Sequence, residues 1–128
     1  VFSFEGHHPI EDIPKYTERA DVLVGCLVKS DLLEATIPAK VMSYIASGKP
    51  LVLAMDGEVQ TLINNTIRGG FAGPTQDANS LADNIKKAYN LPDEKRQELI
   101  ARLQNYHFQN FERNLLLDKL HTFIFTED

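Results

Sequence analysis

Residues 21–54 read DVLVGCLV, KSDLLEAT and IPAKVMSYIASGKPLVLA, and they hold two apolar runs with a helical pattern between them. The first run, Asp21–Val28, is nearly continuous and rich in valine, which is typical of a strand buried on both faces of a parallel sheet. The spacing over Pro38–Ser47 predicts a largely buried helix, and Gly48 suits its left-handed end. Leu51–Ala54 is predicted to be a second buried strand. A strand, a helix and a strand in this order indicate a parallel βαβ unit.

The flanking segments continue this alternation. Val1–Phe4 alternates like a short strand, Glu11–Ala20 follows helical spacing, and Lys29–Thr36 has the polar composition of a loop. After the second buried strand, Gly57–Asn65 indicates a short helix and Gly69–Gly73 a short edge strand. These elements extend the predicted sheet in both directions along the chain.

The last fifty residues contain only helical patterns. The first has an apolar stripe at Leu81, Ile85, Ala88 and Tyr89 with Asp77 or Ser80 as its cap, and two more cover Pro92–Phe111 and Arg113–Phe125. The predicted fold class is therefore α/β, a Rossmann-like three-layer domain with a mostly parallel sheet and a helical C-terminal tail.

The amino-acid composition excludes several classes of protein. The chain has 128 residues, 43% of them hydrophobic and 24% charged, which fits one ordinary domain with a real core. Thirteen Lys and Arg against eighteen Asp and Glu give a net charge of −5, which argues against a nucleic-acid binder. No apolar run approaches the roughly 20 residues of a membrane span.

The single cysteine, Cys26, excludes an internal disulfide and a Cys-based zinc site, and its apolar neighbours predict a buried, inert thiol. Because Val1 is not an initiator methionine, we expect a piece of a longer chain.

The connection from Lys29 to Lys40 is the strongest candidate site, because ligands bind outside the carboxyl ends of parallel strands. The free backbone N–H groups at the start of the following helix favour an anion, and the Thr36 hydroxyl can cap or donate. Lys40 disfavours the isolated helix but suits a phosphate in front of it. Alternatively, Lys40 points into solvent or pairs with Glu34 or Asp31.

Other candidate sites are weaker. The adjacent pair His7-His8 cannot easily aim both rings at one metal, and no supporting ligand pattern follows. The glycine-rich stretch Gly69–Gly73 lacks the Lys-Ser/Thr of a phosphate loop and fits a turn better. No metal site is expected.

Residues 36–54, TIPAKVMSYIASGKPLVLA, resemble the donor-site motif of retaining family 4 glycosyltransferases, most closely their bacterial surface-polysaccharide members. Those members begin the motif with T-x-P-x-K and end it with Y-x-A-x-G-K-P, and both patterns stand here. Three more stretches resemble the family in the same order: FEGH at 4–7, a helix and an A-D-V strand at 13–24, and D-x-x-x-L-A-x-x-I at 77–85. The resemblance covers most of the chain.

The resemblance implies a GT-B enzyme, in which a C-terminal domain binds the nucleotide-sugar donor and an N-terminal domain binds the acceptor. Residues 1–128 would be a partial C-terminal donor-binding domain, without its opening strands and without the acceptor domain. The isolated chain is therefore expected to be inactive. The helix over Arg113–Phe125 resembles the segment that returns toward the acceptor domain. The full-length enzyme would transfer a sugar from the nucleotide sugar to a saccharide or lipid-linked acceptor, and it would need no cofactor or metal. It would act in the cytoplasm, at the inner face of the membrane.

The resemblance also assigns site residues. Backbone and side chains of Thr36, Ile37, Pro38, Ala39 and Lys40 would hold the donor phosphates and sugar. Relatives carry two glutamates eight positions apart, which fall here on Ala35 and Ser43, with Glu34 one residue out of register. Ser43 would then contact the ribose. Glu34 is the candidate catalytic residue and would contact the sugar hydroxyls. The loop at Gly6 and His7 would lie near the base.

Two other readings stay open at this point. One is a stand-alone flavodoxin-like or receiver-like α/β binding module, although Asp21 begins a strand where a receiver needs acids at strand ends. The other is a nucleotide-sugar epimerase with the GT-B fold, which shares the architecture but not the T-x-P-x-K start.

Overall fold

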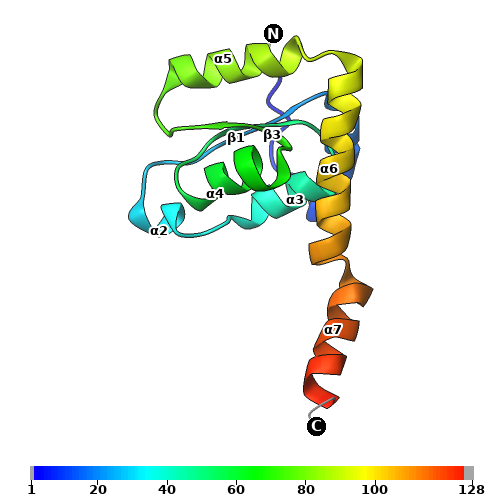
Figure 1. Ribbon diagram of the computed structural model, residues 1–128. Helices are drawn as coiled ribbons and strands as arrows, with labels where there is room; N and C mark the ends of the chain where they lie inside the picture. The colour runs from blue at the N-terminus through cyan, green and yellow to red at the C-terminus, as the bar shows by residue number, and fades with distance from the viewer. Residues whose placement is uncertain (1, 126–128) are drawn as a thin grey trace.

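The computed structural model describes residues 2–125 and contains a three-stranded parallel sheet in the order β1-β2-β3 (Figure 1). The strands are β1 (Leu23–Cys26), β2 (Leu51–Ala54) and β3 (Gly70–Gly73). Their register aligns Leu23 with Leu51, and Leu51 with Gly70. The mixed α/β class and the parallel strand pairing predicted from the sequence are confirmed, and the sheet is small.

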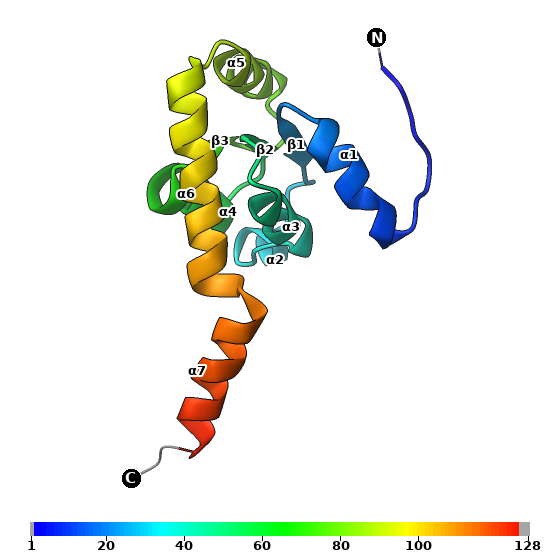
Figure 2. The same cartoon turned by 90° about the vertical axis from the view of Figure 1, so that its right-hand side faces the viewer.

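Helices surround the sheet. They are α1 (Ile13–Arg19) after a 3-10 turn (η1, Ile10–Asp12), α2 (Asp31–Glu34), α3 (Ala39–Ser47), α4 (Glu58–Thr61) continued by a π-helix (η2, Leu62–Ile67), α5 (Ala78–Tyr89), α6 (Asp93–Phe111) and α7 (Arg113–Phe125). Helix α5 lies over one face of the sheet, and α3 and α4 lie on the other (Figure 1). Helix α6 packs against α3, and α7 projects away from the body (Figures 1 and 2).

The core lies on the face of the sheet that α3 covers, between β2 and the helices on that side. All four residues of β2 are buried, as its apolar run predicted. Buried side chains from β2, α3, the α4–η2 segment and α6 form one cluster that includes Leu51, Leu53, Val41, Ile45, Val59, Ile63, Leu99 and Leu103. Burial of this cluster is what fixes α3 and α6 against the sheet. Among the described residues no helix has the length and apolarity needed to cross a bilayer.

Two predicted helix ends are confirmed. Gly48 has φ of 67° directly after α3, a left-handed conformation in which a Cβ is disfavoured. The Asp77 side chain accepts a 2.9 Å hydrogen bond from the Ser80 backbone N–H, so Asp77 rather than Ser80 caps α5.

The predicted strand at Val1–Phe4 is wrong for the residues that the structure describes, and Val1 lies outside them. Residues 2–9 belong to no helix or strand, and the side chains of Phe2 and Phe4 are 93% and 95% exposed. Alternating apolar residues favour a strand only where a partner strand pairs with them, and none lies beside this segment among the described residues.

The first apolar run is also less buried than predicted. β1 covers only four residues of the predicted eight; Gly25 is buried, whereas Val24 is 45% exposed. Cys26 is exposed too, so the predicted buried thiol is wrong. The reason is position, because β1 is an outer strand of the sheet and a valine-rich run does not reveal whether a strand is central or outer.

Helix α3 is half-buried rather than largely buried. It buries Val41 and Ile45 against the sheet but leaves Ser43 and Ala46 exposed. The predicted loop at Lys29–Thr36 contains the single turn α2, and the predicted short helix after β2 runs on through η2.

Candidate functional site at the carboxyl edge of the sheet

Because the three strands are parallel, the loops that follow them leave the sheet at one edge. These are the long connection from β1 to α3, the turn after β2 at Met55–Gly57, and the segment from β3 to Asp77. The strongest sequence-predicted site, the connection from Lys29 to Lys40, is the first of these loops, and its predicted phosphate-binding residues 36–40 lie at the start of α3. Topology therefore supports this edge as the place where a ligand would bind.

The amino end of α3 has free donors. Pro38 occupies the N-cap position and no side chain caps the helix, while the Val41 N–H bonds to the Pro38 carbonyl at 2.9 Å. Within residues 2–125, the amide N–H groups of Ala39 and Lys40 have no acceptor. A helix of nine residues with two unsatisfied amides at its start favours a negatively charged group there.

Thr36 does not cap α3, contrary to the sequence expectation. Its hydroxyl donates to the Leu33 carbonyl at 3.4 Å, and its N–H bonds to the same carbonyl at 3.3 Å. The hydroxyl thus closes the turn at the end of α2, two residues before the N-cap position. Ile37, which follows it, is 41% exposed.

Lys40 lies exposed in the first turn of α3. In the described part of the chain, neither Glu34 nor Asp31 forms an ion pair with it, so the predicted pairing is wrong, whereas the exposure of Lys40 agrees with the alternative that it points into solvent. A cation in the first turn opposes the helix dipole, and no protein anion offsets that cost here.

The predicted site residues Ser43 and Glu34 lie on either side of the amino end of α3 in the sequence. Ser43 is exposed one turn further along α3, where its hydroxyl donates to the Ala39 carbonyl at 3.3 Å. Glu34 ends α2 and lines a small hollow at the carboxyl edge.

Gly6 and His7 belong to the N-terminal segment, which lies on the far side of α1 from the sheet (Figure 2). Gly6 has φ of 78°, so the turn that the sequence indicated is present. No hydrogen bond between described residues joins either residue to the 34–43 stretch. The neighbouring His8 is held by the Glu5 carbonyl and the Tyr16 hydroxyl, at 2.6 and 2.9 Å from Nε2. Within residues 2–125, no three or more His, Cys, Asp or Glu side chains lie close enough together to form a metal site.

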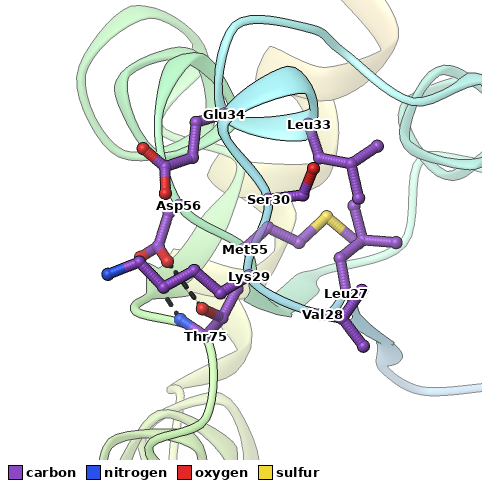
Figure 3. Close-up of a pocket in the computed structure, with 9 residues that line it drawn as sticks. All are labelled: Leu27, Val28, Lys29, Ser30, Leu33, Glu34, Met55, Asp56 and Thr75. Atoms are coloured by element: carbon purple, nitrogen blue, oxygen red, sulfur yellow. Dashed lines mark hydrogen bonds between the residues drawn. The ribbon is translucent and has the colours of Figure 1, made fainter.

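Asp56, Lys29 and Thr75 also stand at this edge. The sequence reasoning missed Asp56 and Thr75, and it included Lys29 only as the first residue of the candidate connection. With Ser30, Glu34 and apolar side chains they line the hollow, and Figure 3 shows Lys29 extending toward the Asp56 carboxylate. A signal was available, because Asp56 closely follows the apolar run of β2 and Lys29 closely follows the apolar run that contains β1. The carboxyl ends of parallel strands bring such residues together.

The Asp56 carboxylate is held by three donors. Oδ2 accepts from the Thr75 hydroxyl at 2.6 Å, and Oδ1 accepts from the Thr75 N–H at 3.3 Å and from Gln60 Nε2 at 3.2 Å. The Thr75 hydroxyl is the main cause that lowers the pKa of Asp56 below its ordinary value, and the Thr75 N–H and the Lys29 charge act in the same direction.

Gly57 keeps the neighbouring loops close together. It has φ of 78°, and a Cβ at this position would collide with the backbone carbonyl of Glu34. Both the conformation and the close approach require glycine. The turn after β2 therefore packs directly on the end of α2.

Comparisons with protein-family models, with curated proteins and with solved structures give no match for this chain.

Proposed function

We propose that this chain is the donor-binding part of a retaining glycosyltransferase and that the amino end of α3 holds the diphosphate of a nucleotide sugar. The observation that carries the proposal is the start of α3. Among residues 2–125, two amides without acceptors and a lysine without an ion-pair partner meet there, at the carboxyl edge of a parallel sheet. A bound diphosphate satisfies both amides and offsets the cost of Lys40 in the first helical turn.

The resemblance to family 4 glycosyltransferases supports a diphosphate site at the same place, the amino end of α3. Its T-x-P-x-K start falls at residues 36–40, which precede and open α3, and its Y-x-A-x-G-K-P end spans the turn from α3 into β2. The glycine of that second pattern is Gly48, whose positive φ explains why the pattern holds a glycine. The two ends of the motif thus coincide with the start and the end of α3, where its proline and its glycine suit the backbone conformation.

The proposed chemistry follows from these donors. Breaking the bond between sugar and phosphate increases the negative charge on the departing diphosphate. Fixed backbone N–H groups of Ala39 and Lys40, together with the Lys40 ammonium, stabilise that charge more in the transition state than in the ground state. In this proposal Ser43 contacts the ribose from the next helical turn, and Glu34 contacts sugar hydroxyls.

Two exposed features support a larger assembly, in which the acceptor site lies on another domain. The sheet ends at β1 with a free outer edge, where further strands of a complete donor domain could pair. Helix α7 carries Leu116, Leu117, Leu120, Phe123 and Ile124 on one face, each at least 42% exposed. In the proposal this stripe packs against the acceptor domain, and the 128-residue chain alone transfers no sugar.

The test is an amide chemical-shift titration of the labelled chain with UDP, GDP and ADP. Saturable shifts at Ala39, Lys40 and Ser43 with at least one nucleotide are expected. Lys40→Ala should weaken that binding about tenfold or more, because it removes a charged hydrogen bond. Lys86→Ala is the control, since Lys86 lies in the last turn of α5 and already pairs with Asp83. No shift with any nucleotide at millimolar concentration overturns the proposal.

A further inference from the structure

Two parts of this chain lack backbone partners, and both lie on the same side of the molecule. The outer edge of β1 presents the amides of Val24 and Cys26, which have no acceptor among residues 2–125. Residues 2–5, here called the N-terminal arm, belong to no helix or strand. Figure 2 shows the arm beyond β1, on the side away from β2 and β3, which is also the side that the open edge faces.

The N-terminal arm has the alternation of a strand with one apolar face. Phe2 and Phe4 alternate with Ser3 and Glu5, so an extended arm points both rings to one side and both polar side chains to the other. Both phenylalanine side chains are almost completely exposed. Their burial therefore requires a surface that this arm does not reach in the described chain.

Contacts with α1 hold the arm away from β1 of its own chain. His8 Nε2 lies 2.6 Å from the Glu5 carbonyl oxygen and 2.9 Å from the Tyr16 hydroxyl, so the end of the arm is fixed against α1. Helix α1 lies between the arm and the sheet (Figure 2). A second molecule reaches the arm in this position, whereas docking on its own β1 requires the arm to leave α1.

The open edge of β1 adjoins an apolar surface of suitable chemistry. Val24, Ile85 and Tyr89 line a hollow on the face of the sheet that α5 covers, and each is at least 42% exposed. A strand added beside β1, with its phenylalanines on this face, places the rings against these three side chains. Its backbone then pairs with the outward groups of β1. The charged side chains of Asp21, Asp93 and Arg96 line the same hollow and form a polar rim.

The area available at this contact suits a stable dimer. Because each covered phenylalanine buries about 150–250 Å², two arms with two phenylalanines each bury about 600–1,000 Å² of their own surface. The surfaces that receive them lose a similar area, and the total of about 1,200–2,000 Å² falls within the range of specific interfaces. Each copy gives one arm and receives one, so the assembly closes with two-fold symmetry.

We propose that two copies of this chain form a dimer by exchanging N-terminal arms, each arm adding a short strand to the outer edge of β1 in the other copy. Phe2 and Phe4 anchor the arm in the hollow beside Val24. The inference goes beyond the proposed function and does not rest on it, because neither the arm nor β1 belongs to the amino end of α3. In the 128-residue chain, the arm takes the place that further strands of a complete donor domain would take.

The first experiment measures the mass of the purified chain by light scattering over a range of concentrations. We expect a dimer of twice 14.4 kDa that dissociates on dilution. The double variant Phe2→Ser, Phe4→Ser should fold, because both side chains are exposed in the single copy, and it should raise the dissociation constant of the dimer about tenfold or more. Phe108→Ser is the matched control, since Phe108 is an exposed phenylalanine of α6, and it should change this constant less than about twofold.

Three outcomes of this experiment overturn the proposal. One is a monomer at every concentration up to the millimolar range. Another is a dimer that the double variant leaves intact. The third is a dimer that Leu120→Ser dissociates while the double variant does not, because the interface then lies on the exposed face of α7.

The second experiment asks where the arm binds. Hydrogen exchange at the Val24 and Cys26 amides should be slow in the dimer and fast after dilution or in the double variant. In a Ser3→Cys variant, Cys26 is the one other thiol of the sequence, and a short bis-maleimide should join two chains. Adding Cys26→Ser should abolish this cross-link. A cross-link within a single chain, or slow exchange of both amides at every dilution, would mean that the arm docks on its own β1 and overturns the exchange.

Discussion

The two outer edges of the sheet differ sharply. Along β3, the Asn64 side chain donates to the Ala72 carbonyl at 2.8 Å and accepts from the Ala72 N–H at 2.9 Å, so it pairs with that peptide as a neighbouring strand would. Along β1, the odd-numbered residues bond toward β2, and the Val24 and Cys26 amides face outward without a described partner. Side-chain pairing closes one edge, and the other edge is open.

Burial separates the central strand β2 from the open outer strand β1. Val24 and Val52 are partners in the register and point to the same face of the sheet, the face that α5 covers. Val52 is fully buried, whereas Val24 is 45% exposed and lines an open hollow with Ile85, Tyr89 and the charged side chains of Asp21, Asp93 and Arg96. The comparison teaches that pairing on both sides accompanies burial of β2, whereas β1, which pairs on one side only, stays partly exposed among the described residues.

The largest expected effect separates these two valines. Val52→Ala should lower the free energy of unfolding by about 2 to 3 kcal/mol, because it removes two buried methyl groups and leaves a cavity. Val24→Ala should lower it by less than about 0.5 kcal/mol, since Val24 is already half exposed. Urea unfolding of both variants measures the difference, and equal losses would show that β1 is as well packed as β2.

A smaller effect is expected at the closed edge. Asn64→Ala should lower the free energy of unfolding by about 1 kcal/mol, because it removes both hydrogen bonds to Ala72. It should also speed hydrogen exchange at the Ala72 amide toward the rates of Val24 and Cys26. Asn65→Ala is the control, because Asn65 is an exposed neighbour without such bonds. Slow exchange at Ala72 in the Asn64 variant would mean that another group protects this edge.

The smallest expected effect concerns the contact between Thr75 and Asp56, which joins the loops after β3 and β2 at the carboxyl edge. Thr75→Val removes the hydroxyl that chiefly lowers the pKa of Asp56, so this pKa should rise toward its ordinary value. A pKa lowered by folding stabilises the native state above the ordinary aspartate pKa, and that stability is lost as pH falls through the folded value. The variant should therefore lose less stability on acidification than the unaltered chain does. Carboxyl NMR titration measures the shift, and an unchanged Asp56 pKa contradicts the assignment.

Local patterns predicted most elements well. β2 begins and ends at its predicted residues because Leu51–Ala54 is apolar throughout and follows a glycine and a proline. Gly48 and Asp77 marked their helix ends because their chemistry acts over a few residues. The start of α3 was found for the same reason, since a proline and a lysine after a buried strand specify a local arrangement.

The candidate site could be predicted only in part. Residues 36–43 form one continuous motif, which a sequence displays directly. Lys29, Asp56 and Thr75 come from three different loops, and their association depends on the order of the strands and the register between them. Nothing in the neighbourhood of Asp56 in the sequence reveals that Thr75, 19 positions later, occupies its carboxylate.

Sequence alone predicted the position of most helices and strands, because apolar periodicity, caps and glycines act through neighbours within one or two turns. Tertiary structure decided which strands became outer ones. The valines of β1 and of β2 resemble each other in sequence, but pairing on both sides buries one strand and leaves the other half exposed. The same dependence on partners left Phe2 and Phe4 exposed outside any strand, because backbone groups in a strand gain their hydrogen bonds only from another strand.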